Sequence, residues 1–384
     1  MKIVVIGGGP AGLYFAYLMR RDGGGHDIRI FERNPSDATF GFGVVFSDRA
    51  LGFLKAGDRD TYGYLKRHME SWPDFKVVLG GEAVPIDGNG FSAIGRLKLL
   101  GLLQARCEEA SVEVQFERPL RSVDEVADAD LVVGADGVNS LVRRSHAEEF
   151  RTRRTELSNR FAWYGTTKAF DCLTLTYREN AHGVFCAHHY RYAPAMSTFI
   201  VECDAATWRR AGLDTMGNAE ARAYCERVFA PELDGHRLIS NRSVWRRFPV
   251  VRNHRWWTGN KVLLGDALRT AHFSIGSGTR LAMEDAIALA AALKEHGRDL
   301  PAALARYQAT RQPAVEALVS AATASARWYE RMADLVRLEP YEFAHAYMTR
   351  TGRVSDQRLE RIAPDFMRRY QARRAPRRAS GGRS

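Results

Sequence analysis

The chain has 384 residues, of which 45% are hydrophobic and 26% charged, an ordinary globular composition that suffices for one large domain or two interlocked ones. No apolar run reaches the ~20 residues needed to cross a bilayer, and the N-terminus has no signal-peptide pattern, so we predict a cytoplasmic protein that does not enter the membrane. The formal net charge of +11 suits a polyanionic small molecule, whereas no motif supports nucleic-acid binding.

A glycine-rich loop follows the first predicted strand. Residues 2–6 have the apolar character of a buried parallel strand, and residues 11–21 that of the helix after it. In the loop between them, Gly7 permits a tight turn, Gly9 lets the backbone approach a diphosphate, and Gly12 allows close packing of helix and strand. The helix N-terminus stabilises negative charge, so this segment predicts a nucleotide site.

The second predicted strand supports the same site. Residues 28–32 end in Glu32, about 20 positions after the last glycine of the loop, which is the spacing of an acid that holds ribose hydroxyls. We expect Pro10, Ala11 and Arg33 to lie against the same nucleotide. An NAD-dependent dehydrogenase remains compatible with this motif alone, so later segments must decide.

Two later strands each lead into an aspartate. Residues 131–134 precede Asp136, and residues 262–264 precede Asp266. Acids at the carboxyl ends of parallel strands stand where ligands bind in open α/β sheets. The alternative is that both are helix N-caps, a role that aspartate favours. Three such loops spread along one chain indicate a single long cofactor across the fold, and therefore FAD.

The third loop continues into a glycine-rich segment. Gly276, Gly278 and Thr279 precede a helix predicted over residues 281–296, and a second helical pattern covers residues 302–339. Backbone N–H groups at such a helix start suit a flavin ring, on which negative charge develops during reduction. We therefore expect these three residues to bind the cofactor.

The middle of the chain has the alternating, β-branched and aromatic pattern of an antiparallel sheet, with strands predicted at residues 161–164, 172–177, 183–190 and 197–203. The predicted fold is α/β, a Rossmann-like FAD-binding fold with an inserted antiparallel β-sheet substrate domain and C-terminal helices that pack on the nucleotide fold. The predicted boundaries are 1–157 and 251–330 for the FAD-binding domain, 158–250 for the substrate domain, 331–366 for the helices and 367–384 for a basic flexible tail.

These motifs resemble those of the group A FAD-dependent aromatic hydroxylases, the para-hydroxybenzoate hydroxylase type, over nearly the whole chain. The matching segments are residues 7–12, 134–143, 265–267 and 307–313. Longer stretches are similar to the branch of salicylyl-CoA 5-hydroxylase and 2-aminobenzoyl-CoA monooxygenase, namely residues 39–48, 90–96, 229–236 and 270–279. The third fingerprint departs from the group's pattern at Leu268, Arg269 and Arg280.

The resemblance implies bound FAD, with Arg96 near its diphosphate and ribityl chain, and NADH or NADPH as a transient reductant. It further implies that reduced FAD reacts with O2 to form a C4a-hydroperoxide that hydroxylates an electron-rich ring. The expected substrate is an aryl-CoA thioester, first salicylyl-CoA, which would give gentisyl-CoA. The alternatives are 2-aminobenzoyl-CoA, whose enzymes carry a further C-terminal domain that we do not expect here, and a free aromatic acid.

His188 is the first candidate for substrate activation. On a strand it would share a face with Cys186 and Tyr190, whereas His189 would point away. We hypothesise that His188 lines the ring pocket and that a base there deprotonates a phenol. His272 is the competing candidate, and a purely structural histidine is an equal alternative.

Residues 42–46 form an apolar segment beside Gly41 and Gly43, which we interpret as a loop whose Val45 lines both the flavin and the substrate ring. A buried core turn is the alternative. The five cysteines lack a CxxC pair, so we expect free thiols and no metal site. An oxygen-independent flavoprotein reductase and a non-enzymatic nucleotide-binding module remain open, as does the choice between monomer and homodimer.

Overall fold

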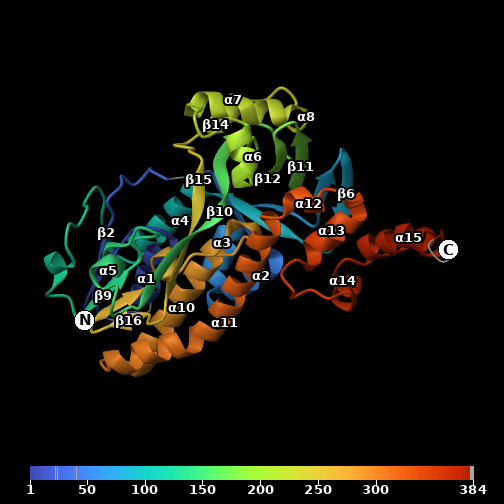
Figure 1. Cartoon of the computed structure of the whole chain (residues 1–384). Helices are drawn as coiled ribbons and strands as arrows, with labels where there is room; N and C mark the ends of the chain where they lie inside the picture. The colour runs from blue at the N-terminus through green and yellow to red at the C-terminus, as the bar shows by residue number, and fades with distance from the viewer. Residues whose placement is uncertain (22, 24, 40, 381–384) are drawn as a thin grey trace.

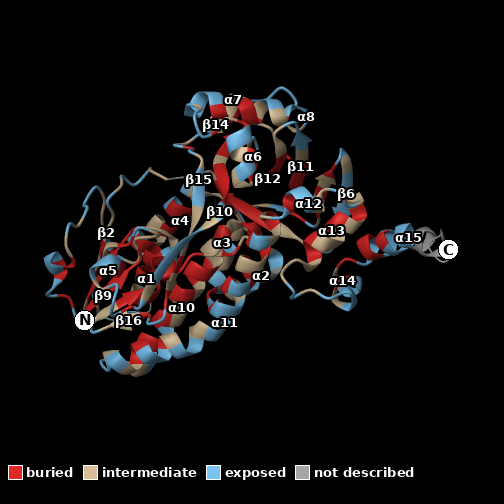
Figure 2. Ribbon diagram, in the orientation of Figure 1, coloured by how far each residue is buried: buried red, intermediate tan, exposed pale blue. Residues whose placement is uncertain are grey.

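The computed structural model of the chain describes residues 1–21, 23, 25–39 and 41–380. Its nucleotide-binding half is built on a sheet with the strand order β16 (Trp257–Thr258), β17 (Lys261–Leu263), β9 (Leu131–Gly134), β1 (Lys2–Ile6), β2 (Asp27–Phe31) and β8 (Glu113–Gln115). All neighbours pair in parallel except β16 with β17. Nearly every residue of β1 and β9 is buried, as in the centre of a parallel sheet (Figure 2).

The helices of this half pack around α1 (Pro10–Arg20), which begins with a proline because the first helical N–H needs no partner. It contacts α4 (Arg96–Glu109) and α10 (Gly278–His296), and α10 packs on the long α11 (Leu300–Tyr329). The shorter helices are α2 (Asp48–Gly57), α3 (Arg59–Lys66), α5 (Leu141–Ser145), α9 (Gly265–Leu268) and the 3-10 turns η1 (Val123–Val126) and η2 (Phe273–Ile275). None of the described helices is long and apolar enough to cross a membrane.

The second sheet has the order β14 (Leu238–Ser240), β10 (Thr152–Thr166), β13 (Met196–Cys203), β12 (Gly183–Ala193), β11 (Leu173–Asn180), β5 (Phe75–Leu79) and β6 (Glu82–Ile86), and β15 (Arg246–Asn253) also pairs with β10. One face is covered by α6 (Ala205–Arg210), α7 (Asn218–Val228) and α8 (Ala230–Leu233) (Figure 1). The predicted α/β fold with an inserted sheet is confirmed. The sheet extends beyond residues 158–250, because β10 starts earlier and β11 pairs in parallel with β5.

A small antiparallel sheet lies between the two halves. Its order is β3 (Gly43–Ser47), β7 (Phe91–Gly95) and β4 (Glu70–Trp72). The loop predicted over residues 42–46 is therefore mostly a strand, in which Val45 pairs with Ala93. Gly43 makes room for a neighbour, since a Cβ there would lie 2.6 Å from the Cβ of Tyr192.

The C-terminal helices pack on the second sheet, not on the nucleotide-binding half as predicted. They are α12 (Met332–Leu335), α13 (Pro340–Thr349), α14 (Asp356–Ile362) and α15 (Pro364–Ser380), so the helix predicted over residues 302–339 is broken after Tyr329. The prediction of a flexible tail from residue 367 is wrong for residues 367–380, because they belong to α15 and its Met367 and Tyr370 are buried. Residues 381–384 of that tail, and Phe40, lie outside the described residues.

Candidate active site

The turn between β1 and α1 has the backbone shape of a diphosphate cradle. Gly7 has a φ of +111°, and a Cβ there would lie 2.5 Å from the carbonyl oxygen of Ala135. A Cβ on Gly12 would lie 2.1 Å from the carbonyl oxygen of Gly7. Gly9 is the N-cap residue of α1 and has open space where a Cβ would stand. The turn itself thus requires two of the glycines, and the third leaves the helix N-terminus open to an anion.

Glu32 lies at the end of β2, directly beside this turn. Its Oε2 accepts a hydrogen bond from the Gly8 N–H at 2.7 Å, and its Oε1 accepts one from the Asn34 N–H at 2.8 Å. The carboxylate is half-buried, and Arg33 next to it is exposed. The structure therefore places Glu32 against the glycine loop, where an acid that holds a ribose is expected.

Asp136 follows β9 and organises the next turn. Its Oδ2 accepts a hydrogen bond from the Leu141 N–H at 2.5 Å, while Ser140, not Asp136, caps α5 through the Arg143 N–H. Burial raises the pKa of Asp136. Its Oδ1 is buried and has no hydrogen-bond partner among the described residues. An unpaired buried oxygen is costly, so a ligand hydroxyl or N–H fits there.

Asp266 of α9 and Arg96, the first residue of α4, lie close enough for their charges to interact. Desolvation by the surrounding protein raises the pKa of Asp266 and lowers that of Arg96, and in each case the charge of the other residue opposes the shift. Neither side chain has a hydrogen-bond or ion-pair partner within the described part of the chain. A free guanidinium and a free carboxylate fit the diphosphate and ribityl hydroxyls of FAD, so the residue set suits this cofactor.

A buried ion-pair network holds α9 in place. Asp285 of α10 is fully buried, and its Oδ2 lies 2.7 Å from Nη2 of Arg269 and accepts a hydrogen bond from the Gly265 N–H at 3.3 Å. Its Oδ1 lies 3.3 Å from Nη2 of Arg311. Burial raises the pKa of Asp285, and the two arginines oppose that shift. Arg269, a departure from the family fingerprint, therefore fixes the loop that carries Asp266.

Val45 of β3 lies against the third glycine loop. A Cβ on Gly276, which has a φ of +59°, would lie 3.4 Å from Cγ1 of Val45. Gly278 and Thr279 follow as the first residues of α10 and are partly exposed. The structure thus brings two distant segments together, and their contact with the flavin ring stays a prediction.

The two predicted catalytic histidines meet at a buried carboxylate that the sequence analysis did not single out. Glu202 of β13 is 1% exposed. Its Oε2 lies 3.4 Å from Nε2 of His188, its Oε1 lies 3.9 Å from Nε2 of His272, and the same Oε1 accepts a hydrogen bond from Asn159 at 2.9 Å. Burial acts to raise the pKa of Glu202, but these polar neighbours outweigh it and the pKa is lowered. The available signal was one charged residue in a strand that is otherwise uncharged.

Aromatic rings surround this cluster of Glu202, His188 and His272. The ring of Phe273 lies 4.9 Å from that of Phe161 and 4.2 Å from that of His272, measured between centroids. The remaining rings of the group belong to Trp163, Phe248 and Tyr329. Apolar walls with a few convergent polar groups are typical of a site for a flat aromatic ligand.

His189 points to the opposite face of the sheet from His188, as predicted. It stacks on Phe199 at 5.2 Å between centroids, and its Nε2 lies 3.0 Å from the Thr176 hydroxyl. Burial lowers the pKa of His189 to about 3 and that of His272 to about 4, so both rings are neutral in the folded protein.

These two histidines predict a loss of stability in acid. The unfolded chain takes up their protons near pH 6.5 and the folded chain does not, so the free energy of unfolding falls as the pH drops below that value, by about 2 kcal/mol per histidine at pH 5. Chemical denaturation at pH 7 and pH 5 measures the fall. The His189→Phe variant should lose less stability than the wild type between these two pH values, and an equal loss would contradict the assignment.

Two family models match this chain. A family described as FAD binding domain matches residues 101–322, and a family described as NAD(P)-binding Rossmann-like domain matches residues 5–39. The first of these spans more than half of the chain. FAD is thus the cofactor of the chain's family, and the glycine loop lies within its nucleotide-binding segment.

Curated relatives are similar over most of the chain. A salicyloyl-CoA 5-hydroxylase from Streptomyces sp. is 43% identical over 91% of this chain and 70% of its own length. A 3-hydroxy-4-methyl-anthranilyl-[aryl-carrier protein] 5-monooxygenase from Streptosporangium sibiricum is 38% identical over 87% of this chain and 91% of its own length.

The fold also has solved counterparts. Crystallised PqsL from P. aeruginosa, described as a probable FAD-dependent monooxygenase, superposes with a TM-score of 0.66 at 22% identity and covers 91% of this chain and 100% of its own. At this identity the likeness concerns the fold alone, whereas the curated relatives establish the family. The chain belongs to the FAD-dependent monooxygenases of the group A flavin hydroxylase family.

Proposed function

We propose that this enzyme hydroxylates the ring of an aromatic acyl thioester, with salicylyl-CoA as the first candidate and gentisyl-CoA as its product, and consumes NADH and O2. The observation that carries the proposal is the 43% identity to a salicyloyl-CoA 5-hydroxylase over 91% of the chain. The aromatic walls around His188, His272 and Glu202 support it, because they offer a flat ring both apolar contact and a base.

When bound and reduced by the nicotinamide nucleotide, FAD would supply the activated oxygen, and the chain would position the substrate and move the protons. The β1–α1 turn, Arg96 and Asp266 hold the cofactor. The aromatic walls orient the substrate ring and exclude water. His188 then accepts the phenolic proton, and the carboxylate of Glu202, 3.4 Å away, stabilises the imidazolium that forms.

A 2-aminobenzoyl thioester is the second candidate substrate. It is favoured by the relative that is named for an anthranilyl group on a carrier protein and is 38% identical to this chain. An amino group activates the ring without losing a proton, so its hydroxylation needs no base. A free aromatic acid is the third candidate.

The test is a comparison of salicylyl-CoA, 2-aminobenzoyl-CoA and free salicylate as stimulants of NADH oxidation, with oxygen uptake and product mass recorded. We expect the thioester to stimulate NADH loss, one O2 to be consumed per NADH, and the product to gain one oxygen atom. Stimulation by free salicylate alone would refute the proposal that the substrate is a thioester. NADH oxidation without oxygen uptake would instead support a reductase.

We also place the enzyme in the cytoplasm. All five cysteines are free thiols, and four of them are buried. Unpaired cysteines suit a reducing compartment. Cell fractionation with an antibody against the chain tests this placement, and recovery in an exported fraction would overturn it.

A further inference from the structure

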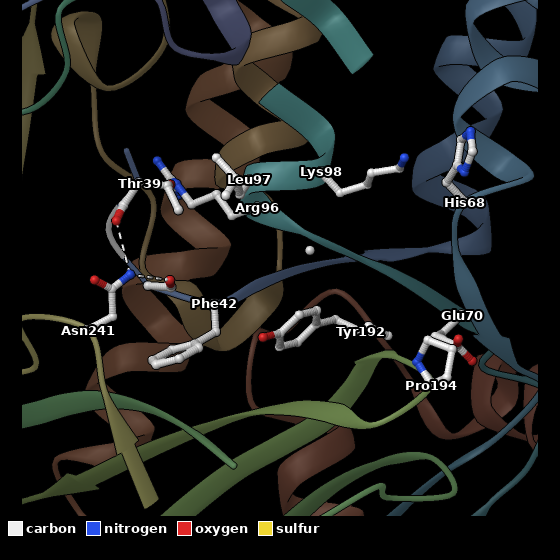
Figure 3. A pocket seen from close by; sticks show the side chains of 13 residues that line it. Thr39, Phe42, His68, Glu70, Arg96, Leu97, Lys98, Tyr192, Pro194 and Asn241 are labelled. Atoms are coloured by element: carbon white, nitrogen blue, oxygen red, sulfur yellow. Dashed lines mark hydrogen bonds between the residues drawn. The ribbon is translucent and has the colours of Figure 1, made fainter. Parts of the chain in front are cut away.

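A cavity of about 510 Å³ opens between the first turn of α4 and the hairpin that joins β12 to β13 (Figure 3). One end of the cavity lies beside the β3 segment, and the other is lined by ionisable side chains. The lining side chains that Figure 3 labels are Thr39, Phe42, Arg96, Leu97 and Asn241 at the first end, Tyr192 and Lys98 in the middle, and His68, Glu70 and Pro194 at the second.

The floor of the cavity includes the ring of Tyr192, which packs closely on the backbone of Gly43 and Gly95. A Cβ on Gly95 would come within 3.3 Å of this ring, and one on Gly43 within 2.7 Å. Burial raises the pKa of Tyr192, so its hydroxyl keeps its proton. That hydroxyl has no hydrogen-bond partner in the described part of the chain, and it is therefore free to donate to a ligand carbonyl.

The charge along the cavity is positive. The side chain of Lys98 has no acidic partner among the residues that the structure describes, whereas Arg96 at the first end is the residue assigned above to the cofactor. The one acid of the lining, Glu70, is 3.1 Å from Nε of Arg191 and is neutralised there. An unpaired cation beside an apolar floor suits a ligand that combines a phosphate with a neutral, amide-containing chain.

The first end of the cavity adjoins the aromatic walls around Glu202, His188 and His272. Gly41 lines the cavity, and a Cβ on it would lie 3.6 Å from the indole of Trp163, which is one of those walls. Asn241 fixes this contact because its Nδ2 donates to the carbonyl oxygens of Thr39 and Gly41 at 3.0 and 3.1 Å. A substrate whose ring lies among the aromatic walls can therefore extend its acyl end into the cavity.

We propose that this cavity is the site of the phosphopantetheine arm of the substrate thioester, with Tyr192 under the amide chain and Lys98 at the phosphate. The inference rests on the proposed acyl-thioester function. Coenzyme A and the arm of an aryl-carrier protein share this chemistry, and the curated relatives are named for one or the other.

The test measures equilibrium binding of salicyl thioesters to the FAD-loaded enzyme by calorimetry, without NADH. Three thioesters are used: of coenzyme A, of pantetheine, which lacks phosphate, and of a holo aryl-carrier protein. Lys98→Ala should raise the Kd of the coenzyme A thioester about tenfold and leave that of the pantetheine thioester within twofold. Lys98→Glu should raise the Kd of the coenzyme A thioester further. Lys98 is exposed, so neither variant threatens folding, and exposed Lys55→Ala on α2 is the matched control.

The coenzyme A thioester and the carrier-protein thioester both contain phosphate, and comparing them identifies the source of the arm. The thioester of the natural carrier should have the lower Kd of the two, and that Kd should rise in Lys98→Ala. Equal losses for the pantetheine and coenzyme A thioesters would overturn the phosphate contact. An unchanged Kd for every thioester, with a raised KM for NADH, would assign the cavity to the reductant instead. Failure of the wild type to bind any thioester while free salicylate binds would refute the proposed function itself.

Discussion

Replacing Gly12 with alanine abolishes FAD binding and destabilises the apoprotein. The added methyl would lie 2.1 Å from the carbonyl oxygen of Gly7 and 3.0 Å from Cγ1 of Val5, so the turn must open or α1 must move away from β1. Forcing a methyl into such a packed contact costs about 1–3 kcal/mol or more. Thermal unfolding of the apoprotein and the flavin absorbance of the purified protein measure both effects.

The matched control is Gly9→Ala in the same turn. No atom lies within 4 Å of a Cβ at this position, and Gly9 has an ordinary φ of −79°. The apoprotein should therefore lose less than about 1 kcal/mol, the range of an altered N-cap. Its FAD affinity should still fall, because the methyl stands where the diphosphate approaches the backbone. Normal flavin content and stability in Gly12→Ala would show that the turn is not the cradle we describe.

Replacing Glu202 with glutamine lowers ring hydroxylation about 100-fold, the range of a lost general base, while FAD stays bound. Glutamine keeps the size of the side chain and an oxygen for Asn159, but it removes the charge that stabilises protonated His188. Product formed per NADH oxidised, followed against pH, is the measurement. The variant should release more H2O2. Its hydroxylation rate should reach its maximum at a higher pH than that of the wild type, because the phenol must then lose its proton with less help from His188.

Exposed Glu156, on β10 of the same sheet, provides the control as Glu156→Gln. It should hydroxylate as the wild type does. If Glu202→Gln lowered the melting temperature but left coupling and the pH profile unchanged, the carboxylate would be structural and His188 would not be its catalytic partner.

Local pattern was sufficient for the nucleotide-binding half. Three features of this half lie directly after a buried strand, so their spacing along the chain reveals them. They are the β1–α1 turn, Glu32 after β2 and Asp266 after β17. The longer-range elements were predicted less well. β3 was taken for a loop because its partner β7 lies far along the chain. The buried face of α15 was masked by its arginines, although Phe366, Met367 and Tyr370 recur at helical spacing.

The sequence by itself determined the fold class, the cofactor and the two histidines worth considering. Only the tertiary structure decided what those histidines contact. Glu202 approaches His188 through the register of β12 with β13, and it approaches His272 through a loop that returns from the nucleotide-binding half. The cavity beside Tyr192 arises in the same way, from strands and a hairpin of separate segments. Spacing along a chain shows which side chains are neighbours on one helix or strand. A buried charge such as that of Glu202 is stabilised by side chains from several helices, strands and loops, which spacing does not show.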